Sequence, residues 1–147
     1  MYFLFFTWEQ ILGMKEILLT FDGGALKKAG KGFGKGYGSY NIRTNGEDKP
    51  SFSKLKETYG NELSSNQAEY MAIIKGIEKV IELYGDNIKL HIKGDSQLVI
   101  NQINGIYRVK SPNMVPLYQK AMTLLKNISE YHAEFWVRAN SEREFGH

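Results

Sequence analysis

The sequence contains no cysteine. Disulfide bonds and thiolate zinc sites are therefore excluded, and we expect an intracellular, cytoplasmic protein. The chain also lacks internal repeats, low-complexity tracts and any shift of composition that would mark a linker. At 147 residues, with 42% hydrophobic and 24% charged residues, it is long enough for one domain with a buried core.

The only candidate for a targeting segment is MYFLFFTWEQILG, residues 1–13. It has no basic start, contains Glu9 and is too short to span a bilayer. Met14 follows directly and could be the initiator. We therefore interpret residues 1–13 as an accessory or upstream extension, with an interfacial anchor as the alternative, and residues 14–147 as the functional domain. We expect a monomer that does not associate with membranes.

The excess of positive charge is small, at +3, although the sequence pI is about 9.0. This balance favours an anionic partner, such as a nucleic acid, only weakly. Composition thus leaves the function open, and particular residues and their spacing have to decide it.

Hydrophobic periodicity predicts an α/β fold with a mixed sheet. A strand over about 16–22 ends at Asp22 and a glycine pair, and two further alternating segments indicate an antiparallel meander. Helical spacing follows, with Ser64 or Ser65 as the cap and Gly85 as the end. The remaining segments read as a strand (87–94), a short helix (96–105), a helix (114–128) and a strand (131–138).

Three acidic residues stand at matching points of this layout. Asp22 and Asp95 each end a predicted strand, and Glu69 lies in the first turns of the first helix. The carboxyl edge of such a sheet is where α/β proteins bind ligands, so the three carboxylates should converge there. Their repulsion would raise their pKa values, and hard divalent cations such as Mg²⁺ would relieve it. Two such ions about 4 Å apart would support phosphodiester cleavage.

Taken singly, each acid has a plainer explanation. Asp22 could be a turn residue, Asp95 the N-cap of the next helix, and Glu69 a solvated helix charge. Spacing alone leaves this choice open.

Four segments, in this order along the chain, resemble type 1 ribonuclease H: LTFDGG, SSNQAEYMAIIKGI, KGDSQLVINQINGIYRVKSPNMVPLY and FWVRAN. The likeness covers about residues 15–140 and is greatest to the short archaeal and bacterial branch without a basic protrusion. It implies a ribonuclease H-like fold, a five-stranded mixed sheet with three antiparallel strands first and flanking helices. It also implies hydrolysis of the RNA strand of RNA–DNA hybrids with two Mg²⁺ or Mn²⁺ ions.

The resemblance assigns the metal-binding, catalytic carboxylates to Asp22, Glu69 and Asp95. Around them we expect substrate contacts of two kinds. Backbone N–H groups at Gly23 and Gly24 can face a phosphate oxygen. Polar side chains at the helix start can meet bases, sugars or 2′-hydroxyls in a minor groove; they are Ser65, Asn66 and Gln67.

The fourth acid of the family is where this sequence departs from the pattern of an Asn followed four residues later by an Asp. The chain ends in WVRANSEREFGH. Matching Asn140 to that Asn makes Glu144 the fourth catalytic and metal-binding residue, and we favour this alignment. A gap-free alignment leaves Phe145 or Gly146 there and no fourth ligand. A third places Asn140, a candidate substrate contact, where other members carry a loop histidine.

The chain stops at His147, so we expect the family's final helix to be missing or only begun. The leading hypothesis is an endonuclease on RNA–DNA hybrids that leaves 3′-hydroxyl and 5′-phosphate ends. One alternative is a non-catalytic module that binds hybrid or duplex RNA. The other is a related metal-dependent nuclease acting on duplex RNA or DNA.

Overall fold

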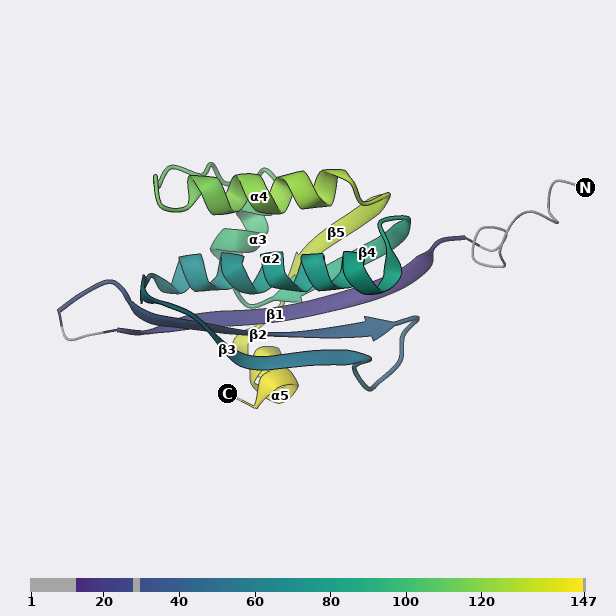
Figure 1. Ribbon diagram of the computed structural model, residues 1–147, viewed down its shortest axis with the longest axis horizontal. Helices are drawn as coiled ribbons and strands as arrows, with labels where there is room; N and C mark the ends of the chain where they lie inside the picture. The colour runs from purple at the N-terminus through teal and green to yellow at the C-terminus, as the bar shows by residue number, and fades with distance from the viewer. Residues whose placement is uncertain (1–12, 28–29, 147) are drawn as a thin grey trace, which may run out of the picture.

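A computed structural model describes residues 13–27 and 30–146, so the proposed extension at 1–13 lies almost wholly outside it. Within the described residues, the strands and helices follow one another in nearly the order that the periodicity predicts (Figure 1). The elements are β1 (Lys15–Lys27), β2 (Gly34–Thr44), β3 (Phe52–Leu63), α2 (Ser65–Tyr84), β4 (Ile88–Gly94), α3 (Gln97–Ile103), α4 (Val115–Lys126), β5 (Glu130–Phe135) and α5 (Arg138–Phe145).

The five strands form one mixed sheet in the order β3-β2-β1-β4-β5. β1, β2 and β3 pair antiparallel, whereas β4 pairs parallel with both β1 and β5. The α/β class and the five-stranded sheet with its antiparallel meander are thus confirmed. Both parallel connections pass through helices, as parallel strands require.

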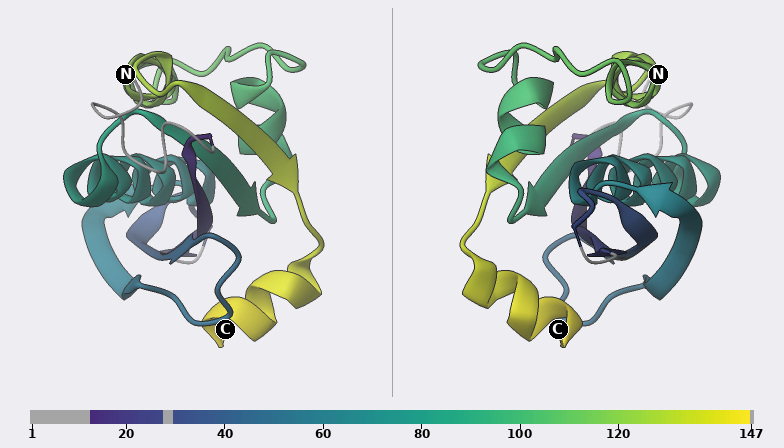
Figure 2. Two further views of the ribbon diagram at one scale, coloured as in Figure 1. Left: turned by 90° about the vertical axis from the view of Figure 1, so that its right-hand side faces the viewer. Right: turned by 90° about the vertical axis from the view of Figure 1, so that its left-hand side faces the viewer.

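The helices divide between the two faces of the sheet. α2, α3 and α4 cover one face, and α5 crosses the other (Figures 1 and 2). The core lies under α2, where fully buried side chains of β1 such as Ile17, Leu19 and Phe21 meet Ile73 and Ile77 of the helix. The opposite face of β1 carries Thr20 and Asp22, because successive strand residues point to alternate sides.

β1 does not end at Asp22 as predicted. It pairs with β2 from Ile17 to Lys27, with Asp22 opposite Ser39 and Lys27 opposite Gly34. The glycine that we read as part of a turn serves close packing instead. A Cβ at Gly23 would lie 2.6 Å from the backbone N of Glu69, so α2 can approach β1 only because that Cβ is missing.

α2 begins with a capping box. The hydroxyl of Ser64 accepts a hydrogen bond from the N–H of Gln67 (3.1 Å), and the Gln67 side chain accepts one from the N–H of Ser64 (2.9 Å). Gly76 lets the helix pack against β1, since a Cβ there would meet Leu19 at 2.6 Å. The capping box orders the first turn of α2, and the close contacts at Gly23 and Gly76 hold the helix, and with it Glu69, against β1.

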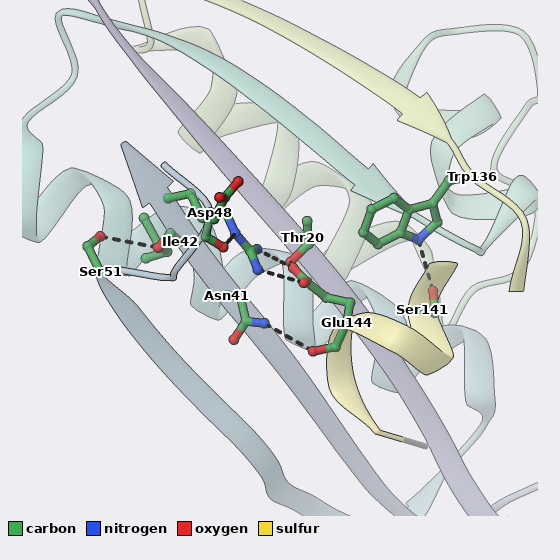
Figure 3. Close-up of polar contacts among 9 residues, drawn as sticks. Thr20, Asn41, Ile42, Asp48, Ser51, Trp136, Ser141 and Glu144 are labelled. Atoms are coloured by element: carbon green, nitrogen blue, oxygen red, sulfur yellow. Dashed lines mark hydrogen bonds and ion pairs between the residues drawn. The ribbon is translucent and has the colours of Figure 1, made fainter. Parts of the chain in front are cut away.

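The C-terminal segment differs from expectation in two ways. The fifth strand ends at Phe135 rather than at Arg138, and a helix of eight residues, α5, follows it. The indole Nε1 of Trp136 donates a hydrogen bond to the Ser141 hydroxyl at 2.9 Å, which fastens the second turn of α5 (Figure 3). None of the helices in the described ranges is both long and apolar enough to cross a membrane.

Candidate active site

Asp22 and Asp95 stand side by side because of the parallel pairing of their strands. β1 and β4 are in register up to Phe21 and Gly94, and each acid is the next residue. Asp22 is only 4% exposed, and the Asp95 side chain only 7%. Glu69 joins them from the second turn of α2, which packs on the strand at Gly23. The structure thus brings the three predicted carboxylates together, although Asp22 lies within β1 and not at its end.

The pKa values of Asp22 and Glu69 are raised because these carboxyls are buried and close to one another. Burial, together with the charge of Asp95 and a hydrogen bond between the two side chains, raises the pKa of Asp22 to about 7. Burial likewise raises the pKa of Glu69 to about 7, with the charges of Asp95 and Asp22 adding to the effect and a hydrogen bond from Ser96 opposing it. Desolvation and like charge act together here, as they do in sites that bind cations.

The donor set fits a hard divalent cation. The Oε2 atom of Glu69 is buried and has no hydrogen-bond partner among the residues that the structure describes. A buried acceptor without a partner is costly, and a cation supplies the missing interaction. Over the same residues, no three His, Asp or Glu side chains already surround one metal position. Side-chain rotation of the acids would therefore accompany metal binding.

Asp95 is not the cap of the helix that follows it. Ser96 is the N-cap of α3, and its hydroxyl accepts a hydrogen bond from the N–H of Val99 at 3.2 Å. The alternative interpretation of Asp95, as the N-cap of the next helix, is therefore wrong. Its carboxylate faces Asp22 and a cation instead.

That cation is Arg138, which the sequence reasoning did not single out. Its Nη1 atom lies 3.2 Å from Oδ2 of Asp95, and its charge lowers the pKa of both Asp22 and Glu69. Arg138 is the first residue of α5, just after β5, and β5 is the parallel neighbour of β4. Arg138 was the last residue of the predicted fifth strand, at the edge where the acids were expected, but we assigned it no role; in the structure it lies three residues after the end of β5.

Glu144, the candidate fourth ligand, contacts β1 at Thr20, two residues before Asp22, and contacts β2 at Asn41 and Arg43. Its carboxylate pairs with the Arg43 guanidinium, with Nη2 to Oε1 at 2.8 Å, and accepts a hydrogen bond from the Thr20 hydroxyl (Figure 3). The Asn41 side chain also reaches the backbone carbonyl of Glu144, at 3.5 Å. Thr20 and Asp22 share one face of β1, so Glu144 is held two residues along the strand from the acidic cluster.

The partners of Glu144 decide its charge state. Burial alone would raise its pKa, but hydrogen bonds from Arg43 and Thr20 and the Arg43 charge outweigh it and lower the pKa. The side chain is 11% exposed. Glu144 is therefore an ionised, satisfied carboxylate in this structure, in contrast to Glu69.

The predicted substrate contacts at the start of α2 border a cavity of about 600 Å³. Asn66 and Gln67 line it, together with Ser64, Gln102 and Asn113 from the capping residue, α3 and the following loop. Asn66 is exposed, whereas Gln67 is already used in the capping box. Ser65 adjoins these residues in the first turn of α2. Gln102 and Asn113 were missed because single polar residues carry no periodic signal.

Asn140 lies within the first turn of α5, and its Oδ1 accepts a hydrogen bond from Arg143 of the same helix. Of the two glycines predicted to approach a phosphate, Gly24 is buried and Gly23 half-buried, both inside β1. Gly23 donates its N–H to Oδ1 of Asp22 at 3.0 Å. That N–H thus orients the carboxylate in this structure.

The sequence is similar to a known protein family and to several known proteins. The profile of the family described as reverse transcriptase-like matches residues 44–142. The bifunctional protein Rv2228c of Mycobacterium tuberculosis is 25% identical over 126 residues, covering 86% of this chain and 32% of that protein. Ribonuclease HI of Halobacterium salinarum is 34% identical over 80 residues, covering 54% and 39%. This chain spans about a third of the length of these curated relatives.

Solved structures share the fold. RNase H1 of the halophilic archaeon Halobacterium salinarum NRC-1 matches with a TM-score of 0.74 and 26% identity, over 87% of this chain and 90% of that one. LC11-RNase H1, solved in complex with an RNA/DNA hybrid, matches with a TM-score of 0.74 over 86% and 89%. At 21% identity the second likeness speaks for the fold alone.

Proposed function

This chain belongs to the reverse transcriptase-like family, and from that premise we propose that it hydrolyses the RNA strand of RNA–DNA hybrids. The observation that carries the proposal is the buried set of Asp22, Glu69 and Asp95, in which one Glu69 oxygen lacks a partner within the described part of the chain. Binding of a nucleic acid alone would not require three repelling carboxylates next to a polyanion. A cation-dependent reaction would.

In this proposal Asp22, Glu69 and Asp95 hold two Mg²⁺ or Mn²⁺ ions. When bound, the ions would activate a water molecule and stabilise the leaving oxygen, giving 3′-hydroxyl and 5′-phosphate ends. The protein's own part is positioning. The Gly23 N–H orients the Asp22 carboxylate, and the capping box fixes the helix turn that carries Glu69.

The cavity beside the start of α2 is the proposed contact with the hybrid. Its polar lining of Ser64, Asn66, Gln102 and Asn113 offers hydroxyl and amide groups that can recognise both a phosphate and a 2′-hydroxyl. Two relatives support this substrate class, since one carries the name ribonuclease HI and a structure of the same fold holds an RNA/DNA hybrid. The hybrid is therefore the substrate to test first.

Glu144 stays our prediction for the fourth ligand, with one added condition. To reach an ion it would have to leave Arg43 and Thr20, which satisfy it in this structure. Asn140 stays a candidate substrate contact, since it lies one turn before Glu144 on the same helix.

The proposal is tested by incubating the protein with end-labelled RNA–DNA hybrid, duplex RNA and duplex DNA, each with Mg²⁺, with Mn²⁺ and with EDTA. We expect cleavage of the hybrid alone, in the RNA strand, and none with EDTA. Cleavage of duplex RNA or DNA would favour the related nuclease instead, and tight binding without cleavage the non-catalytic module. A 2′,3′-cyclic phosphate on the product would contradict attack by water.

A further inference from the structure

We propose that Arg138 is a resident cation of the acidic cluster, which competes with the divalent metal for Asp95 and so sets how tightly this chain binds that metal. The inference rests on the proposed function, because it takes Asp22, Glu69 and Asp95 as the metal ligands. It concerns a residue to which neither the sequence pattern nor the family likeness gave a role.

Arg138 contacts the acidic cluster but is itself exposed to solvent, so a metal ion can displace it. Its guanidinium contacts Oδ2 of Asp95 at 3.2 Å, yet the Arg138 side chain is 65% exposed while that of Asp95 is 7% exposed. The arginine thus reaches over the mouth of the cluster from the solvent side. An exposed ion pair contributes little to stability, so little is lost when a divalent ion replaces it.

The charge of Arg138 acts on the whole cluster and not only on its contact partner. It lowers the pKa of Asp22 and of Glu69, which means that it favours the ionised carboxylates in the absence of metal. A metal ion would perform the same electrostatic task with twice the charge. Two cations that stabilise the same three carboxylates also repel each other, so binding of one weakens binding of the other.

Arg138 also contacts an acidic side chain of its own helix. Its Nε atom lies 3.8 Å from Oε1 of Glu142, four residues further along α5, where the carboxylate is 58% exposed. A guanidinium that leaves Asp95 can keep this partner without any movement of the helix. Arg138 therefore has two acidic partners, one inside the cluster and one outside it.

The matched comparison is with Arg143, five residues along the same helix. It bonds to Asn140, and among the described residues it enters neither the Asp22 nor the Glu69 electrostatics. Arg138→Gln and Arg143→Gln remove the same charge from the same helix. Arg138→Lys keeps the charge but loses the guanidinium fork.

The experiment measures Mn²⁺ binding to the full chain without substrate, by electron paramagnetic resonance of free Mn²⁺, for the wild type and these three variants. We expect Arg138→Gln to bind Mn²⁺ about fivefold more tightly, the low end of typical coupling between sites because the guanidinium is largely exposed. Arg138→Lys should stay near the wild type, and Arg143→Gln should be unchanged. Equal or weaker binding by Arg138→Gln would overturn the inference.

A second measurement on the wild type does not depend on any variant folding. In a ¹⁵N NMR titration with Mg²⁺, the Nε–H resonance of Arg138 should shift at the same Mg²⁺ concentration as the Asp95 amide, while that of Arg143 stays in place. A stationary Arg138 resonance beside a shifting Asp95 amide would contradict displacement. If the wild type binds neither ion, the proposed function fails as well, which separates that result from a failure of this inference alone.

Discussion

Arg43 of β2 and Glu144 of α5 lie 101 residues apart in the chain and form a two-pronged ion pair. Both side chains are largely buried, at 16% and 11% exposure. The pair fixes the last helix to the face of the sheet that carries Asp22. In this structure, then, the residue expected at the metal is the anchor of the C-terminal helix.

This anchor should be measurable as stability. We expect Arg43→Met and Glu144→Gln each to lower the free energy of unfolding by about 1–3 kcal/mol, since each leaves a partly buried charged or polar group without its partner. Their effects should not add, because both break one pair. Urea denaturation of the two single variants and the double variant measures the coupling.

The control is an exposed pair on the same face of the sheet. Lys93 and Glu134 are 3.8 Å apart and are 38% and 71% exposed, so Lys93→Met and Glu134→Gln should show a coupling of only about 0.2–1 kcal/mol. Equal coupling in the two pairs would mean that Arg43 and Glu144 do not anchor α5.

The carboxylates of the cluster should matter for activity and not for folding. Asp22→Asn, Glu69→Gln and Asp95→Asn should each lower hybrid cleavage by about 10⁴-fold or more, the scale found when a residue of a catalytic set is removed. Circular dichroism should stay unchanged. Near-normal turnover in any one variant with Mg²⁺ would remove that residue from the proposed ligands.

The stability of the metal-free protein should fall as pH rises. Asp22 and Glu69 have pKa values of about 7 in the fold, against about 4 in an unfolded chain. Between these values the native state binds more protons than the unfolded state, so the free energy of unfolding decreases with pH. Urea midpoints in EDTA from pH 4.5 to 7.5 test this.

Two comparisons check the cause of that pH dependence. Asp22→Asn should flatten the slope, because one of the two shifted groups no longer titrates. Saturating Mg²⁺ at pH 7.5 should raise the midpoint, because the ion stabilises the ionised carboxylates. A midpoint that rises with pH in EDTA would contradict the burial of these carboxyls.

The contact of β1 with α2 depends on a missing side chain at Gly23. Gly23→Ala should cost about 1–3 kcal/mol or more, because the added Cβ would lie 2.6–2.7 Å from backbone atoms of Ala68 and Glu69 that have little room to move. Gly32→Ala is the matched control, since nothing lies within 4 Å of a Cβ there. Equal urea midpoints for the two variants would refute the packing argument.

Much of the fold could be read from the sequence because the apolar residues change their spacing where the structure changes. Alternating segments become β1 to β3, and the i, i+3, i+4 pattern of Tyr70, Ile73, Ile74 and Ile77 becomes the buried face of α2. The three acids were proposed for a related reason. Asp95 follows a strand and Glu69 lies near the start of a helix, whereas Asp22 was proposed from a strand end that the structure does not have.

The errors arose where a residue has more than one use. A glycine pair after an acid usually marks a turn, but at Gly23 it permits contact between two elements distant in sequence. Glu144 stays a prediction and is not one of these errors, but no local pattern reveals its partner Arg43, which lies on a strand 101 residues earlier. Arg138 was given no role, although it ended the predicted fifth strand, because an arginine is not a metal ligand.

The last prediction decides between the two roles of Glu144, anchor and ligand. Arg43→Met and Glu144→Gln should destabilise the fold alike, but only Arg43→Met leaves the carboxylate free to turn. If Glu144 is the fourth ligand, Arg43→Met should strengthen Mn²⁺ binding, and Glu144→Gln should weaken it and slow cleavage by about 10²-fold. If Glu144 is only an anchor, neither variant should change Mn²⁺ affinity when both are measured well below their unfolding midpoints. Asn140→Asp completes the test, because it should raise cleavage only if Asn140, and not Glu144, occupies the fourth position.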